Sequence, residues 1–211
     1  MFNLYGNLTS LDNYISTSNG EYKYRNMFEN TNVYDCSKLN TGIKTIKGSG
    51  VFNFMFKDCK NLIKAPNLPA TTLADSCYSN MFYGCTSLTT IPDLPATTLA
   101  NSCYSNMFRG CTSLTTIPSN LLPATNLAYS CYNHMFSGCT GLTTIPSNLL
   151  PSTTLADNCY QNMFSGCTSL TTIPSNLLPA TNLAYSCYES MFSGCTSLTT
   201  IPSNLLPATT L

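Results

Sequence analysis

The sequence predicts an α/β fold in which short coils stack side by side into one curved solenoid. Six Met-Phe pairs recur along the 211 residues at intervals of 26, 26, 28, 28 and 28 residues. Repeats of about 20–50 residues are typical of solenoids, because one unit cannot bury its apolar face without a neighbour. Each unit joins a segment with helical spacing to a short segment rich in Thr and Ile. The pairs begin at Met55, Met81, Met107, Met135, Met163 and Met191.

The first half of each unit has the apolar spacing of an amphipathic helix. In the unit that begins at Pro95, apolar residues fall at i, i+3, i+4, i+7 and i+8, with Ser and Asn between them. This spacing predicts a helix from about Thr98 to Phe108. Thr97 or Thr98 is suited to cap its start, and Gly110 is suited to the left-handed residue just past its end. The apolar positions are Ala100, Cys103, Tyr104, Met107 and Phe108.

The second half of each unit is predicted to be a short strand. The segment CTSLTTIP at residues 111–118 is too short for a helix, is rich in Thr and ends at Pro118. Stacked units would place these strands in parallel, about 4.8 Å apart, and a wider helical layer would curve the stack. The two-residue difference between coils lies in the loop after the strand, so both lengths can share one core. Two ladders are expected to be core: Leu88, Leu114, Leu142, Leu170 and Leu198, and Ile91, Ile117, Ile145, Ile173 and Ile201.

The ends of the chain differ from the regular array. We expect residues 1–50 to form an N-terminal cap with a degenerate repeat, and residues 51–211 to form the solenoid of about six repeats. Eight of the nine basic residues lie in residues 1–64, where they either solvate the exposed end or bind an acidic partner. The chain ends at Pro207–Leu211, the start of a further unit, with no closing cap. We therefore expect either that the natural chain continues or that another chain covers this end.

One motif carries a resemblance to a known family. The motif MFxGCTSLTTIP is complete at Met81–Pro92, Met107–Pro118, Met163–Pro174 and Met191–Pro202, and Gly141 replaces Ser in the copy at Met135–Pro146. It resembles the core of BspA-like leucine-rich repeats, and the similarity extends over residues 51–211. The resemblance implies a leucine-rich-repeat solenoid. It also implies adhesion or partner recognition, as in surface proteins of bacteria, some protists and gut bacteriophages. This unit is a few residues longer than the usual one.

Composition and motifs argue against several classes of function. Only 9% of the residues are charged and the formal net charge is zero, which does not suit a nucleic-acid binder. No apolar run approaches the ~18 residues of a membrane span, and residues 1–11 lack the basic and apolar regions of a signal peptide. The only histidine, His134, takes an exposed polar position of the predicted helix, without a partner for acid-base or triad chemistry. We expect no enzymatic activity, no catalytic residue and no cofactor.

The cysteines fall on two ladders, eight residues apart within each unit. Either each coil contains a disulfide, or the thiols are buried and reduced. A helix between the two cysteines would hold them near 10–12 Å, beyond the ~7 Å limit for a disulfide, so we favour reduced thiols. A metal site is not expected, because CxxC spacing is absent. The ladders are Cys77, Cys103, Cys131, Cys159 and Cys187, and Cys85, Cys111, Cys139, Cys167 and Cys195.

The threonine pairs of the predicted strands form the candidate binding surface. If the Leu and Ile of each unit point inward, the second Thr of each pair points outward, which predicts an uncharged strip covered by hydroxyls. Thr is also a good exposed strand residue, so the strip has an explanation without any ligand. An ice-binding array is less suitable, because the Thr residues are adjacent and not alternating. The candidate binding residues are Thr90, Thr116, Thr144, Thr172 and Thr200.

These observations predict a non-enzymatic recognition or adhesion module that is exposed at the cell surface or outside the cell. Its expected partner is a host or bacterial surface protein or a glycan, with affinity built from repeated weak contacts. The alternative is a structural or receptor-binding component of a bacteriophage virion. A scaffold that holds other chains is a third possibility.

Overall fold

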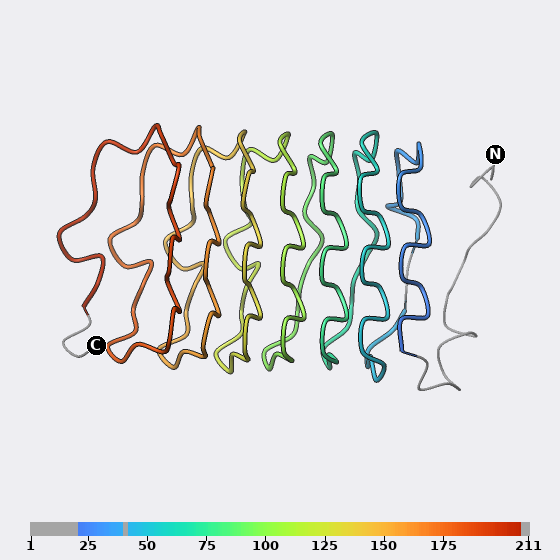
Figure 1. Ribbon diagram of the computed structural model, residues 1–211, viewed down its shortest axis with the longest axis horizontal. Helices are drawn as coiled ribbons and strands as arrows, with labels where there is room; N and C mark the ends of the chain where they lie inside the picture. The colour runs from blue at the N-terminus through green and yellow to red at the C-terminus, as the bar shows by residue number, and fades with distance from the viewer. Residues whose placement is uncertain (1–20, 40–41, 208–211) are drawn as a thin grey trace.

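The computed structural model describes residues 21–39 and 42–207, which form a row of stacked coils (Figure 1). Successive coils lie side by side from the N-terminal end to the C-terminal end, and the row is nearly straight in this view. Residues 1–20 of the predicted cap and residues 208–211 of the predicted uncapped end lie outside the described residues. The predicted stacking of coils is confirmed, but the coils are not built from a helix and a strand.

Ten-residue runs of consecutive turns replace the predicted helices. The described residues form no α-helix, so the helix predicted over 98–108 is wrong. In the run at residues 101–110, Met107 N–H donates to Tyr104 O at 3.2 Å and Arg109 N–H donates to Asn106 O at 3.1 Å. A bond to the third preceding residue closes a turn, whereas an α-helix bonds to the fourth. The runs cover residues 21–30, 49–58, 75–84, 101–110, 129–138, 157–166 and 185–194.

A left-handed residue at every fourth position causes this conformation. The φ angles of Ser102, Asn106 and Gly110 are 51°, 54° and 74°. A helix needs negative φ at each residue, whereas one common turn type places a positive φ at its third residue, where Gly or Asn is favoured. Gly110 is therefore left-handed as predicted, but it is the last of three such residues and does not end a helix.

In the turn runs from residues 21–30 to residues 157–166, the remaining N–H groups bond to the next coil. Tyr104 N–H donates to Cys131 O at 3.0 Å, and Asn106 N–H donates to Asn133 O at 2.8 Å. The backbone donors of a run are thus satisfied alternately within the coil and by its neighbour, as a buried backbone requires. The pattern is already present at residues 21–30, inside the segment predicted as a cap, where Tyr24 N–H donates to Val51 O at 2.9 Å.

The predicted strands are also absent from the described residues. Backbone bridges occur only singly there, as three parallel pairs at residues 35 and 64, 45 and 72, and 98 and 126. The Thr-rich segments still lie in register, because Thr143 N–H donates to Thr115 O and Thr171 N–H donates to Thr143 O, both at 3.3 Å. One such bond between adjacent coils does not make a strand ladder. The helical layer that was expected to curve the stack is absent from residues 21–39 and 42–207 as well.

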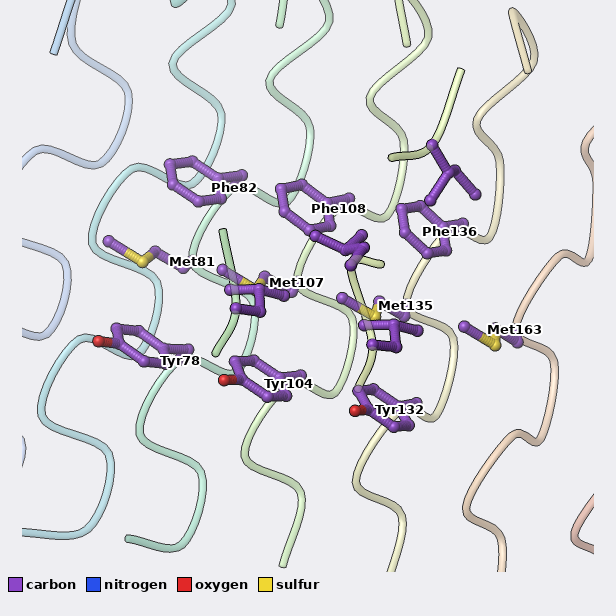
Figure 2. Close-up of a cluster of buried hydrophobic side chains, with 14 of the residues drawn as sticks. Tyr78, Met81, Phe82, Tyr104, Met107, Phe108, Tyr132, Met135, Phe136 and Met163 are labelled. Atoms are coloured by element: carbon purple, nitrogen blue, oxygen red, sulfur yellow. The ribbon is translucent and has the colours of Figure 1, made fainter. Parts of the chain in front are cut away.

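Two aromatic stacks run through the core of the described coils. Neighbouring ring centroids lie 5.3–5.9 Å apart, and no ring pair is tilted by more than 13°. Figure 2 shows part of both stacks, with a row of Met side chains between them. Parallel rings at such distances attract one another beyond their apolar burial. The stacks are Tyr24, Phe52, Tyr78, Tyr104, Tyr132, Tyr160 and Tyr188, and Phe28, Phe56, Phe82, Phe108, Phe136, Phe164 and Phe192.

The predicted Leu ladder lies in the same core, and the Ile ladder does so in part. Leu88 through Leu170 are buried at their four positions, and Leu198 is half-buried. Three Ile side chains are buried, Ile91 is half-buried, and Ile201 is 74% exposed, which corrects its assignment to the core. Ile201 differs because no further coil lies against it in the part of the chain that the structure describes.

The two coil lengths share one core, as the loop comparison predicts. The shorter loop at residues 92–95 buries Leu94, with 3% of its surface exposed. The longer loop at residues 118–123 buries both Leu121 and Leu122, with 3% and 2% exposed. The extra residues of the longer loop therefore add a second apolar side chain to the interior without interrupting the stacks.

Candidate functional site: the threonine surface

All five candidate binding threonines are exposed in the structure. Thr90, Thr116, Thr144, Thr172 and Thr200 each lie next to an equally exposed Thr that precedes it in the sequence. The register of the coils aligns these pairs along the stack. The structure therefore brings the predicted residues together as one continuous surface, here called the threonine surface, although no strand forms it.

In three of the five pairs, the hydroxyl of the first Thr holds neighbouring coils together. Thr143 Oγ1 donates to Thr115 O at 3.3 Å, and Thr171 Oγ1 donates to Thr143 O at 3.5 Å. Thr89 Oγ1 makes the equivalent bond to Ile63 O at 3.3 Å. These hydroxyls supplement the single backbone bond between adjacent Thr-rich segments. Their role is structural, and their donors are not available to a ligand.

The second Thr of each pair is different over most of the surface. The hydroxyls of Thr116, Thr144 and Thr172 have no hydrogen-bond partner among residues 21–39 and 42–207. Each can therefore donate one hydrogen bond and accept others. Thr90 is the exception, because its Oγ1 accepts from Ala65 N–H at 3.4 Å and donates to Ile63 O at 3.5 Å. The available part of the threonine surface thus begins after Thr90.

An amide ladder extends this surface into the longer loops. Asn148 Nδ2 donates to Asn120 Oδ1 at 3.3 Å, and both residues are exposed. Asn120 and Asn148 were not among the predicted binding residues. The signal was available, because Asn recurs at the same place in every longer loop, beside the threonine pairs.

The outer surface of the turn runs carries a second set of polar contacts between coils. Asn133 Nδ2 donates to Gln161 Oε1 at 2.7 Å, and Gln161 Nε2 donates to Glu189 Oε2 at 2.7 Å. The guanidinium of Arg109 lies 5.7 Å from the ring centre of Tyr83, a cation–π distance. These are the positions at which the copies vary most. These side chains are paired with one another, whereas Tyr129 and Tyr185 of the same runs are 54% and 75% exposed.

His134 lies on a turn run and is half-buried, which corrects its placement on an exposed helix. It has a φ of 54°, like Asn106 and Asn162 at the equivalent positions. Its Nδ1 contacts Asn133 Oδ1. Burial lowers the pKa of His134, and the positive charge of Arg109 lowers it further. No carboxylate approaches the ring to form a catalytic pair in the described residues.

The described cysteines are free and buried, but not for the predicted reason. No helix separates them. Instead, the second thiol of each unit donates to a Phe carbonyl of the preceding coil: Cys111 Sγ to Phe82 O and Cys139 Sγ to Phe108 O, both at 3.1 Å. Burial raises the pKa of the thiols, to about 12 for Cys131 and Cys159 of the first ladder and for Cys167, which donates to Phe136 O, of the second. A neutral thiol is the form that fits this role, because a thiolate would leave the carbonyl without its donor.

The described residues contain no group of three or more His, Cys, Asp or Glu side chains that would hold a metal ion. They also contain no helix with the length and apolar character needed to cross a membrane.

Comparison with known proteins identifies one family. The model of the BspA type leucine-rich repeat region matches residues 24–162 and 122–206, with six copies. The matched residues begin inside the segment predicted as a cap. Neither the curated proteins nor the solved structures contain a match to this chain.

Proposed function

The chain belongs to the BspA-type leucine-rich repeat family, and from this premise we propose that it is a non-enzymatic recognition module whose threonine surface binds a protein or carbohydrate partner. One observation supports this most directly. Thr116, Thr144 and Thr172 repeat in register with hydroxyls that no described residue of the chain uses. Beside them, the hydroxyls of Thr143 and Thr171 bond to the preceding coils, which holds the three free hydroxyls in register.

The chemistry of the threonine surface determines how it would bind. It has no charge between residues 110 and 156, so long-range electrostatic attraction contributes little. Each hydroxyl contributes about 0.5–1.5 kcal/mol if it makes one good hydrogen bond. Three hydroxyls in a fixed array together slow the dissociation of the partner. The coils hold them at constant spacing, so little entropy is lost on binding.

A set of three variants tests the proposal. Thr116, Thr144 and Thr172 are changed together to Val, which removes the hydroxyls at nearly constant shape, and in a second protein to Ser, which keeps them. A matched control changes the exposed residues Asn101 and Tyr129 of the turn runs to Ser. Binding to arrayed glycans and to host or bacterial surface proteins is measured for each. We expect the Val protein to lose at least about tenfold in affinity, and the Ser and control proteins to bind like the wild type.

Equal binding by the Val protein and the wild type would refute the proposal. Binding lost only in the control would place the interaction on the turn runs.

Exposure at the cell surface follows from the same proposal. Protease treatment of intact cells should release peptides of this chain, and peptides found only in lysed cells would contradict the assignment. The alternative role in a bacteriophage virion has no separate observation in its favour and stays a prediction. Mass spectrometry of purified virions would test it.

A further inference from the structure

The turn run at residues 185–194 presents a row of unused hydrogen-bond donors. One coil earlier, Tyr160 N–H donates to Cys187 O and Phe164 N–H donates to Met191 O, both at 3.0 Å. The equivalent N–H groups of the run at residues 185–194 have no partner among the described residues. Unpaired backbone donors in register are a template for pairing with another chain. They belong to Ser186, Tyr188, Ser190, Phe192 and Gly194.

Apolar side chains are uncovered at the same end of the stack. Ile201 is 74% exposed, whereas Ile173, one coil before it, is 6% exposed. Leu206 is 56% exposed, against 3% for Leu178. Covering this end would bury these side chains, which is favourable. The end therefore offers both contributions that join neighbouring coils within the chain, backbone pairing and apolar burial.

The chemistry of this end limits what can cover it. The carbonyls of the run at residues 185–194 already accept hydrogen bonds from this run or from the preceding coil, so only its N–H groups are free. Two copies of this end would present donors to each other and could not pair. A partner must present carbonyls at the spacing of a turn run. The other end of the described stack does so, because the carbonyls of Glu21, Arg25, Met27 and Glu29 accept no hydrogen bond from a described residue.

The run at residues 21–30 also has the matching shape. Its second, sixth and tenth residues are left-handed, with φ of 56–58°, and the same positions of the last described run have φ of 48–74°. The two aromatic stacks begin at Tyr24 and Phe28 and end at Tyr188 and Phe192. Placing the first run of one copy against the last run of another would continue both stacks. Both runs are already folded, so little order is lost on contact.

The two ends carry opposite charges at one ladder position. Along this ladder, Asn133 Nδ2 donates to Gln161 Oε1 and Gln161 Nε2 donates to Glu189 Oε2, both at 2.7 Å. Glu189 can only accept, so the next side chain must be a donor. The described ladder begins at Arg25, whose guanidinium lies over two aromatic rings and has no carboxylate partner among the described residues. Stacking would bring Arg25 beside Glu189, as a charge-assisted hydrogen bond requires.

We infer that copies of this chain stack head to tail, with the run at residues 185–194 of one copy donating hydrogen bonds to the run at residues 21–30 of the next. Glu189 of the first copy then pairs with Arg25 of the second. The contact joins two different surfaces, and the row of coils is nearly straight (Figure 1), so the assembly stays open and further copies can add. This assembly goes beyond the proposed function and does not depend on it.

One residue makes this junction weaker than those within the chain. Lys23 stands where the following coil has Val51 and the later coils have a buried Cys, so stacking would bring it against Cys187. Removing an ammonium from water costs free energy. We therefore expect reversible association that increases with protein concentration, and not a permanent polymer.

Charge reversal at the two ends tests the inference on the full chain. Glu189→Arg and Arg25→Glu are made singly and together. Asp93→Arg is the control, because Asp93 is exposed and belongs to neither terminal run. Sedimentation velocity over a hundredfold range of concentration gives the mean mass in solution, where one copy has 22.9 kDa. Circular dichroism and the urea midpoint check that each variant is folded.

The wild type and Asp93→Arg should pass from 22.9 kDa to more than twice that mass as the concentration rises. Each single variant should associate at least about tenfold more weakly, because like charges then face each other. The double variant should associate like the wild type, and so should an equal mixture of the two single variants. Residues 25 and 189 lie in opposite terminal runs, so this rescue can arise only between copies.

Three results would overturn the inference. They are a wild-type mass of 22.9 kDa at every concentration, association that the single variants leave unchanged, and a dimer that grows no further. Lys23→Val tests the register of the contact separately. It should strengthen association at least about tenfold, because no ammonium then leaves water. Unchanged association of Lys23→Val would overturn the register.

Discussion

Truncation of one ring in the phenylalanine stack tests whether the continuous stack stabilises the molecule. Phe136 is fully buried, and its ring centroid lies 5.6 Å from that of Phe108 and 5.8 Å from that of Phe164. Replacing a buried Phe with Ala costs about 3–5 kcal/mol, through lost burial, a cavity and lost ring contacts. Phe192 is half-buried and is stacked on one side only among the described residues, at 5.8 Å from Phe164. Phe192→Ala should therefore cost about half as much as Phe136→Ala.

Urea unfolding followed by far-ultraviolet circular dichroism and by tyrosine fluorescence measures the difference. With a slope of about 3 kcal/mol/M, Phe136→Ala should lower the midpoint by about 1–2 M and Phe192→Ala by about half of that. A central defect also weakens the coupling between the coils on either side, so the transition of Phe136→Ala should broaden. If Phe192→Ala lowered the midpoint as much as Phe136→Ala, ring stacking through the interior would not be what stabilises the array.

Three further predictions concern single side chains. Tyr104→Phe should leave the free energy of unfolding unchanged or raise it by up to about 1 kcal/mol. The buried hydroxyl of Tyr104 has no partner among the described residues, and Phe52 already occupies the equivalent place in the stack. A loss above about 1 kcal/mol in urea unfolding would contradict this. His134→Asn should raise the free energy of unfolding by about 0.5 kcal/mol, and with it the melting temperature, because Asn tolerates the left-handed backbone better. A lower melting temperature would count against the turn geometry. Stability should fall between pH 9 and about 12, because burial raises the pKa of Cys131 and Cys159 to about 12 and the unfolded chain releases these protons first. A pH titration of the urea midpoint checks this, and a midpoint that rises over this range would refute it.

The stacking of the coils could be predicted because it depends only on the repeat. Once Met107 and Phe108 recur at a fixed interval, equivalent residues must meet in adjacent coils, and the buried ladders follow. The conformation within a coil could not be predicted in the same way. Apolar pairs at residues 103–104 and 107–108 fit a helical period of 3.6 and a turn period of 4 equally well over so short a segment.

A more specific signal for the turns was present in the residues between the apolar pairs. Ser102, Asn106 and Gly110 follow one another at intervals of four, and all three have positive φ in the structure. Asn and Gly tolerate this backbone, and both are poor helix formers. Reading these residues as turn positions, and not as the polar face of a helix, would have predicted the turn runs.

The candidate site was predictable in outline and not in detail. Exposure of Thr116 and Thr144 followed from the inward position of Leu114 and Leu142. The different roles of Thr143 and Thr144 did not, because the bond from Thr143 to Thr115 depends on how closely the two coils approach. The bond from the thiol of Cys139 to Phe108 O could not be predicted either, because it is a contact between coils that the sequence spacing of the two residues does not indicate.

The uniform junctions between coils have a consequence for how such a chain changes over generations. The same N–H and carbonyl positions join residues 101–110 to 129–138 and residues 129–138 to 157–166. An unequal exchange between two gene copies would therefore delete or duplicate a whole coil and still leave matching partners on both sides of the new junction. The length of the array can vary by this route while each remaining coil keeps its neighbours, so the extent of the surface can change without a new fold.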